Sequence, residues 1–309
     1  MLTVFYSRLP LAAVWYVRKH GSLGCCLVDS PRRDANHERR NIVGSLWHLL
    51  ESPPFPSFEL LRATTMKDSN EKRWFPLESN PTLLNTYVGN LGFSTDRYSF
   101  VDVFSTDSWA LDMIPRPVLA LVVLFPVTDE IVERRKILHE GRLSLGHEKS
   151  CSGVWYVKQR IRNACGTIAI LHALANLPSA VQTSEILPSS WLQQYLETCP
   201  ASTSPDHKAS ILENDDTIET PHDEATNHCS NQTNRGELND PIDMHFITFT
   251  HVNGKLYELD GRVDNGPICH GCTSKSEFLK DACGVIRELM EADKDELRFT
   301  MMALVPSSS

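Results

Sequence analysis

The chain has 309 residues, of which 41% are hydrophobic and 22% charged, and its formal net charge is −9. This composition excludes collagen, coiled coils and wholly disordered chains, and an acidic chain without a basic stripe is a poor nucleic-acid binder. The longest uncharged apolar stretch, residues 117–127, is about half as long as a membrane-spanning helix, so we expect neither a membrane nor a nucleic-acid partner.

Residues 1–72 differ in character from the rest of the chain. They begin with basic residues and contain no acidic residue before Asp29, loosely like a mitochondrial presequence, and a proline-rich break follows at residues 52–57. The sequence predicts a poorly ordered N-terminal extension over residues 1–72 and a folded domain over residues 73–305. A presequence is the alternative for the extension.

Regular patterns begin after this break. Asn80 followed by Pro81 predicts a helix start, and apolar residues at helical spacing lead to Gly92, which predicts its end. Residues 99–104 and 118–126 are expected to be strands, and the second is apolar on both faces, which indicates a central position in a sheet.

The middle of the chain is acidic. Residues 197–243 contain eleven acidic residues and only two basic ones, which favours either a partner with a basic surface or a solvated loop. We expect short helices at 191–196 and 208–213, and a long mobile loop at 219–240, where nearly every residue is polar.

The last third has clearer signals. Residues 245–250 and 255–260 are rich in β-formers and flank Asn253-Gly254, a strong hairpin signal. An apolar stripe over residues 278–290 predicts a helix, and alternation over residues 297–304 predicts a terminal strand.

Cys165 is a candidate nucleophile. The stretch that follows it is small and apolar on all sides, which predicts a buried helix with Cys165 in its first turn. Unpaired N–H groups and the helix dipole stabilise a thiolate at that position. The alternative is a small core residue, the commonest fate of a lone cysteine.

The hairpin supplies a candidate base. If strand partners pair symmetrically about the Asn253-Gly254 turn, His245 and Asp260 become diagonal neighbours on one face, with Cβ atoms about 7 Å apart. Asp260 can then hold the imidazole in the tautomer that presents its other nitrogen to Cys165. Gln159 carries a side-chain amide that can donate to an oxyanion, together with the Cys165 backbone N–H. A solvated strand histidine with a turn aspartate is the alternative.

These residues fall in motifs that resemble the ubiquitin carboxyl-terminal hydrolases, a family of cysteine proteases. The resemblance is strongest to the short isozymes of the family and covers about residues 73–304, in the family's order. The motifs are Arg73–Pro81, Pro115–Pro117, Lys158–Thr167, Asp243–Phe246, Leu256–Arg262 and Asp295–Phe299.

The resemblance implies an α/β (α+β) papain-like cysteine protease fold with a central antiparallel sheet flanked by helices and a knotted chain path. It implies that Cys165 is the nucleophile, His245 the base, Asp260 its orienting group and Gln159 the oxyanion stabiliser. The expected activity is hydrolysis of small adducts from the C-terminal glycine of ubiquitin. A non-catalytic module that binds and stabilises monoubiquitin is the alternative.

The resemblance also implies where ubiquitin, or a ubiquitin-like modifier, would bind a monomeric enzyme. A loop at about residues 226–239 would cross over the substrate's C-terminal tail. The expected ubiquitin contacts are Pro76, Leu77, Glu78, Asn80, Pro81, Glu296, Leu297, Arg298 and Phe299.

The nine cysteines are an odd number and are scattered over the chain, which favours a reducing compartment, with the cytoplasm expected and the nucleus as a second location. Cys269 and Cys272 flank His270 like half of a zinc site, but no second pair accompanies them at a suitable spacing. We therefore expect no metal and no cofactor.

Overall fold

The computed structural model describes residues 13–17, 23–27, 72–144, 153–229, 231 and 236–307. The chain divides into two compact units, Met1–Lys67 and Asp68–Ser309. In the first unit, β1 (Ala13–Val17) pairs antiparallel with β2 (Leu23–Leu27), a pairing that we did not predict. The rest of the predicted extension lies outside the described residues, apart from Lys72.

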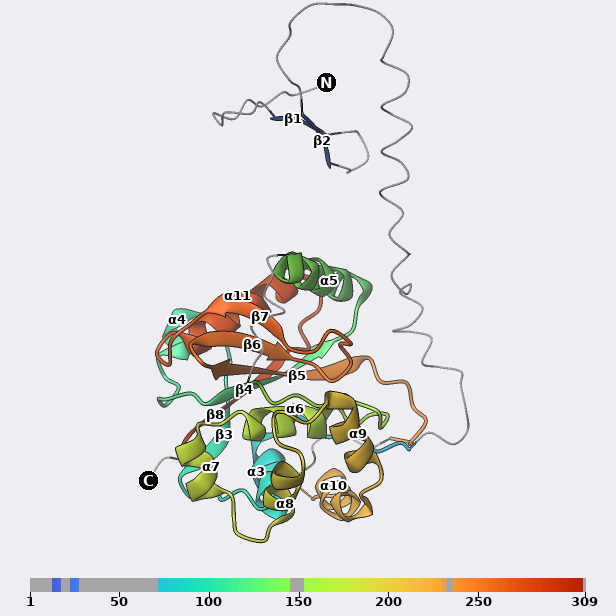
Figure 1. Cartoon of the computed structure of the whole chain (residues 1–309), viewed down its shortest axis with the longest axis vertical. Coiled ribbons are helices and arrows are strands. Elements are labelled where there is room, and N and C mark those ends of the chain that lie inside the picture. Colours follow the sequence, from blue (N-terminus) through green and yellow to red (C-terminus); the bar gives the residue numbers. More distant parts are fainter. Residues whose placement is uncertain are drawn as a thin grey trace, which may run out of the picture. The chain divides into compact units, whose positions relative to one another are not determined.

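The second unit is built around a six-stranded sheet in which every neighbouring pair is antiparallel (Figure 1). This confirms the predicted antiparallel sheet, and β4 lies inside it with Ala120 to Val123 fully buried. The knotted path stays a prediction. In spatial order the strands are β3 (Tyr98–Asp102), β8 (Thr300–Pro306), β4 (Ala120–Pro126), β5 (Met244–Val252), β6 (Lys255–Leu259) and β7 (Ile268–Cys272).

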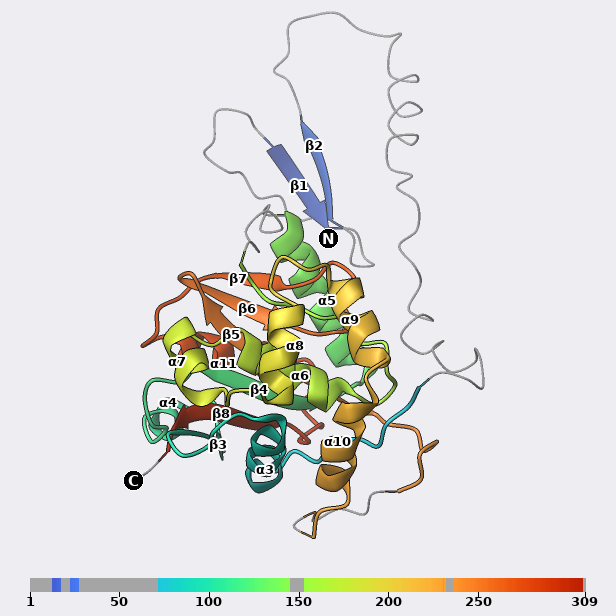
Figure 2. The same ribbon diagram turned by 60° about the horizontal axis from the view of Figure 1, so that its bottom comes forward.

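Helices cover both faces of the sheet (Figures 1 and 2). Successive residues of β4 point to opposite faces, so Leu121 and Val123 pack on one side and Ala120 and Val122 on the other. The first face is covered by α4 (Ser108–Leu111), α5 (Asp129–Ser144) and α11 (Phe278–Met290). The second is covered by α3 (Pro81–Leu91), α6 (Cys165–Ala175), α7 (Ser179–Glu185), α8 (Trp191–Thr198), α9 (Pro205–Glu213), η4 (Asp216–Ile218) and α10 (Glu219–Thr226).

Local signals predicted the ends of α3 and the turn of the hairpin correctly. The side chain of Asn80 accepts a hydrogen bond from the backbone of Thr82 at 3.0 Å, and Gly92 ends the helix with φ 101°. In the hairpin, pairing runs from Val252 with Lys255 to Thr248 with Leu259, which is the predicted register. The helices predicted at 191–196 and 208–213 correspond to α8 and α9.

The prediction of a loop from Glu219 was wrong in its first part, because residues 219–226 form α10. This helix buries His222, Ala225 and Thr226, so its inner face lacks the large apolar residues that mark an amphipathic helix in sequence. The terminal strand was expected to start at residue 297, but Leu297 is exposed and β8 begins at Thr300. In the described part of the chain, no helix is long and apolar enough to cross a membrane.

Candidate active site

Cys165 is the first residue of α6 and is only 5% exposed. Burial by itself raises the pKa of the Cys165 thiol. The interaction with His245, the charge of Arg262 and a backbone hydrogen bond from Phe246 outweigh burial and lower this pKa to about 7. The dipole of α6 acts in the same direction, so the thiolate of Cys165 is stabilised relative to that of an ordinary cysteine.

His245 and Asp260 lie together in the buried end of the hairpin. Nε2 of His245 is 2.7 Å from Oδ1 of Asp260, and both side chains are almost fully buried. The other ring nitrogen of His245, Nδ1, is buried and has no hydrogen-bond partner of standard geometry. It is therefore open to the thiol of Cys165, with which the ring interacts.

The ordered pairing of β5 with β6 ends at Thr248 and Leu259, short of the predicted pairs that would include His245 and Asp260. A tight turn holds Asp260 instead. The hydroxyl of Tyr156 donates to the carbonyl oxygens of Asp260 and Val263 at 2.6 and 2.7 Å. The backbone N–H of Arg262 donates to Oδ1 of Asp260 at 2.9 Å. Burial raises the pKa of Asp260, but the charges of His245 and Arg135 hold it well below the usual range.

Gln159 is anchored to the same turn, because its backbone N–H donates to the carbonyl of Gly261 at 2.8 Å. A side chain at Gly261 would not fit, since its Cβ would lie 2.9 Å from the backbone nitrogen of Gln159. Nε2 of Gln159 donates to the carbonyl of Ile161 at 3.1 Å. An amide nitrogen carries two hydrogens, so one donor is left for another acceptor.

A group of charged side chains that gives no signal in the sequence lies beside the outer oxygen of Asp260. Arg135 of α5 donates from Nη2 to Oδ2 of Asp260 at 2.9 Å and also contacts Glu258. His139 and His270 contact the same Glu258 carboxylate at 3.0 and 2.9 Å. In the described ranges, no group of three or more His, Cys, Asp or Glu residues could hold a metal ion.

The two segments expected to contact ubiquitin lie side by side. Ser79 Oγ lies 2.5 Å from Thr300 Oγ1, which joins the stretch before α3 to the first residue of β8, directly after the segment that ends at Phe299. Within these segments the side chains differ in access, because Leu77 is 6% exposed and packs against Gly166 of α6, whereas Leu297 is 84% exposed. The remaining expected contacts, Pro76, Glu78, Asn80, Pro81, Glu296, Arg298 and Phe299, are partly or fully exposed.

A groove of about 460 Å³ adjoins the second of these segments. It lies between the end of β3 and the residues that lead into β8, and Phe104 at its rim is 88% exposed. Phe104 was missed because it was assigned to a strand, whereas β3 ends at Asp102. The lining also includes Met290, Glu296, Leu297, Phe299 and Met301.

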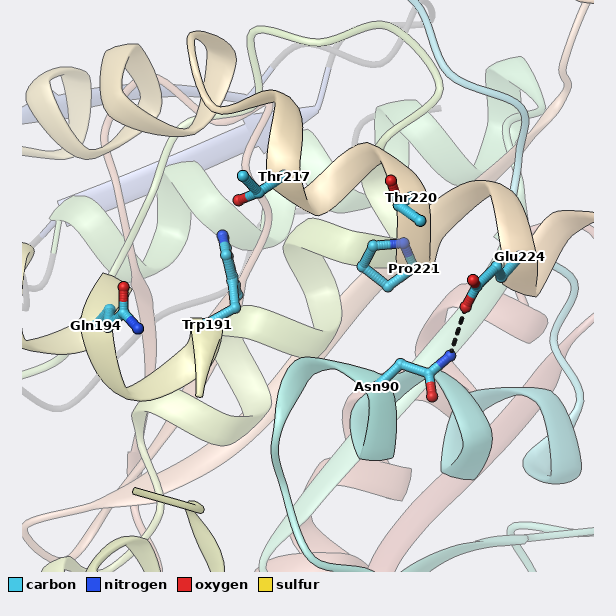
Figure 3. A pocket seen from close by; sticks show the side chains of 7 residues that line it. All are labelled: Asn90, Trp191, Gln194, Thr217, Thr220, Pro221 and Glu224. Atoms are coloured by element: carbon cyan, nitrogen blue, oxygen red, sulfur yellow. Dashed lines mark hydrogen bonds between the residues drawn. The ribbon is translucent and has the colours of Figure 1, made fainter. Parts of the chain in front are cut away.

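A second cavity, of about 490 Å³, lies between α3, α8 and α10 (Figure 3). Asn90 and Glu224 meet at its edge through a hydrogen bond of 3.1 Å, and Trp191 forms part of its wall. Trp191 is itself held by a hydrogen bond to Asp215 at 2.7 Å. This cavity includes none of the residues predicted for catalysis or ubiquitin binding.

The expected crossover loop is described only in part. It begins at Thr226, the last residue of α10, and the described residues 236–239 form its far end. Residues 230 and 232–235 lie outside the described residues. At the far end, Arg73 donates to the carbonyl of Leu238 at 3.4 Å and to the side chain of Asn239.

A buried cysteine at a helix start, facing a histidine–aspartate pair beside an antiparallel sheet, is the arrangement of a cysteine hydrolase. The family profile "Ubiquitin carboxyl-terminal hydrolase, family 1" matches residues 74–291. The chain belongs to this family of cysteine peptidases.

Relatives agree with this assignment. The chain is 38% identical to ubiquitin carboxyl-terminal hydrolase 3 of Arabidopsis thaliana over 78% of this chain and 98% of the relative. It is 36% identical to the human isozyme L1 over 74% of this chain and 96% of that protein. The fold is similar to that of the Trichinella spiralis UCH37 catalytic domain bound to ubiquitin vinyl methyl ester, with a TM-score of 0.60 and 20% identity over 77% of this chain and 97% of that one.

Proposed function

We propose that this chain is a deubiquitinating cysteine hydrolase that removes small adducts from the C-terminal glycine of ubiquitin. In this proposal Cys165 is the nucleophile, His245 the general base and acid, and Asp260 the group that orients His245. Gln159 and the backbone N–H of Cys165 stabilise the oxyanion.

The observation that carries the proposal is the arrangement of Cys165, His245 and Asp260. The thiol has its pKa lowered to about 7, and the imidazole holds Asp260 with one nitrogen while the other is open. A histidine bound in this way can take a proton from a thiol and return it to a leaving group.

The proposed reaction has two stages. The Cys165 thiolate attacks the glycine carbonyl, and the oxyanion of the tetrahedral intermediate accepts hydrogen bonds from the two donors. Collapse breaks the bond to the leaving amine, which takes a proton from the His245 imidazolium, and leaves a thioester. His245 then removes a proton from water, the resulting hydroxide attacks the thioester, and the thiolate leaves.

The groove beside Phe104 supports ubiquitin as the substrate. Phe104 and Leu297 expose nearly their whole apolar side chains, which is typical of a protein-binding surface. The groove includes Glu296, Leu297 and Phe299, which the family motifs predict to contact ubiquitin. We propose that the folded body of ubiquitin docks here while its tail reaches Cys165.

Turnover of a fluorogenic ubiquitin C-terminal amide tests this function. We expect activity in the full chain, loss of turnover in Cys165→Ala, and ubiquitin affinity within about tenfold of wild type in that variant. Cys272→Ala is the matched control, because Cys272 is a free, exposed cysteine outside the predicted ubiquitin contacts and crossover loop. Binding of ubiquitin without turnover in the wild-type chain would favour the non-catalytic module instead.

We also propose that the catalytic domain is complete without residues 1–70, and that the protein works in a reducing compartment such as the cytoplasm. Lys72 has to stay, because it binds Asp216 and Glu219 at 3.1 and 2.8 Å and its carbonyl accepts from Arg162. A chain starting at residue 71 should keep its activity and melting temperature. Insoluble or inactive truncated protein would contradict the proposed boundary.

A further inference from the structure

Arg135 contacts Asp260 directly and reaches His245 through the ring of Phe125. Its Nη2 donates to Oδ2 of Asp260 at 2.9 Å, on the opposite oxygen from the one that binds His245. Its guanidinium also lies 5.0 Å from the centre of the Phe125 ring. The Phe125 ring in turn meets His245 edge to face, at 5.8 Å between centroids.

Arg135 is itself fixed by Glu258, which is two residues before Asp260 in sequence. Oε1 of Glu258 accepts from Nη2 and Nε of Arg135 at 2.5 and 3.2 Å. His139 and His270 bind the same carboxylate, which leaves Glu258 with a partner on each oxygen. Arg135 is 13% exposed and Glu258 2%, so water screens these charges weakly.

We infer that Arg135 is a positioning residue for the reaction, and that Glu258 balances its charge so that Asp260 still stabilises the His245 imidazolium. This inference rests on the proposed function. With one oxygen bound to Arg135 and the other to His245, the Asp260 carboxylate cannot rotate, and the imidazole is held in one orientation. Without Glu258, the full charge of Arg135 would act on Asp260 and oppose protonation of His245.

The two partners have opposite charges, and this gives the inference a distinctive signature. Removing the negative charge of Glu258 disfavours the imidazolium, whereas removing the positive charge of Arg135 favours it. A purely structural loosening would move the protonation of His245 in the same direction for both substitutions. The charged or titratable groups around His245 are Asp260, Cys165, Arg262, Arg135 and Glu258, with His139 and His270 behind Glu258.

The first experiment measures kcat and KM on the fluorogenic ubiquitin amide. Arg135→Met should lower kcat at least about tenfold with KM within about threefold, because the substitution misaligns the base and leaves the ubiquitin surface unchanged. Arg135→Lys should recover part of the loss, since it restores the charge but not the fork of donors. The control is Arg134→Met. Arg134 pairs with Glu288 at a more exposed site on the same helix, so kcat of this variant should stay within twofold of wild type.

The second experiment follows the protonation of the His245 ring by NMR in histidine-labelled Cys165→Ala protein, without substrate. The midpoint should move about one pH unit down in Glu258→Gln and about one unit up in Arg135→Met. Unchanged midpoints, or shifts in the same direction, would overturn the inference. If Arg135→Met does not fold, Arg135→Gln, which also removes the charge but keeps a hydrogen-bond donor, takes its place.

The two experiments separate this inference from the proposed function. If the wild-type chain does not cleave the ubiquitin amide, the proposed function fails, and the NMR midpoints still report on Arg135 and Glu258. If the wild-type chain is active but kcat in Arg135→Met stays within twofold, the positioning role is wrong and the proposed function stands.

Discussion

Two buried histidines reach the first turn of α6, and their bonding differs. His245 holds a carboxylate with Nε2 and leaves Nδ1 open. His222 on α10 is engaged at both nitrogens, because Nε2 donates to the carbonyl of Phe75 at 2.7 Å and Nδ1 lies 3.0 Å from Oγ1 of Thr167. Both rings are almost fully buried, so their partners make one ring a candidate base and the other a structural tie.

The surroundings of His222 support its structural role. Its ring packs on Trp74 at 4.5 Å between centroids, and Thr167 is also bound to the hydroxyl of Tyr87 at 2.9 Å. These contacts fasten α10 and the stretch before α3 to α6. The start of α6, where Cys165 lies, is therefore tied to α10 and to the stretch before α3.

The largest expected difference between the two histidines is in catalysis. His245→Ala should lower kcat by at least about 10⁴-fold, because loss of the general base in a serine protease lowers kcat about 10⁶-fold, with ubiquitin affinity nearly unchanged. His222→Gln should lower kcat less than tenfold and the free energy of unfolding by about 1–3 kcal/mol, because it breaks buried hydrogen bonds. Steady-state kinetics and urea unfolding check both. An equal loss of kcat in the two variants would contradict the distinction.

A third buried histidine, His172 in α6, has no carboxylate bound to its ring among the described residues. It tests whether burial alone lowers the pKa of a histidine in this fold. Burial lowers the pKa of His172 to about 4, from an ordinary value of 6.5. The unfolded chain therefore takes up this proton first, and the folded protein loses stability as the pH falls from about 6.5 to about 4. The loss should be about 3 kcal/mol.

Urea unfolding at a series of pH values measures this effect. The difference between wild type and His172→Gln should shrink as the pH falls through that window, because the variant has no such group. His207→Gln, at an exposed position of α9, is the control. Parallel curves for wild type and His172→Gln would show that His172 does not resist protonation.

The interaction of Cys165 with the open nitrogen of His245 should also affect how the alkylation rate of Cys165 depends on pH. Burial raises the pKa of Cys165, but the interaction with His245 outweighs burial and lowers this pKa to about 7. The rate of alkylation by iodoacetamide should therefore rise as the pH passes through about 7. In His245→Ala the midpoint should move up toward the ordinary thiol value of 9.0. Mass spectrometry of the Cys165 peptide gives the rates, and a wild-type midpoint near the ordinary value would contradict the interaction.

The smallest expected effect concerns the segment that joins the two histidine regions, the predicted crossover loop at residues 226–239. About fourteen residues that go out and back enclose an opening of about 15 Å at most, which is too narrow for a folded domain. Inserting about ten Gly and Ser residues between Asn231 and Asn234 should raise cleavage of diubiquitin severalfold and leave the small fluorogenic substrate nearly unchanged.

The same insertion between Pro188 and Ser189, in an exposed turn before α8, serves as the control and should change neither rate. Equal diubiquitin rates before and after the insertion at Asn231 would show that the loop does not select substrates by size.

The sequence alone determined the features that depend on neighbouring residues. The Asn253-Gly254 turn set the hairpin register, Asn80 and Gly92 marked the ends of α3, and the small apolar stretch after Cys165 predicted a buried helix. Turn geometry, capping and periodicity act over a few residues, so they can be read before the fold is known. The family motifs added candidate roles for residues that these rules only brought near each other.

The tertiary structure decided what joins distant segments. Arg135 lies in α5, a helix we did not predict because half of its residues are charged and it buries only Ile131. Its contact with Asp260 spans 125 positions, and a charged residue gives no sequence signal for the partner it will meet. Likewise, α10 buries a histidine instead of an apolar stripe, because Thr167 and Phe75 provide the hydrogen bonds that let a polar ring enter the core.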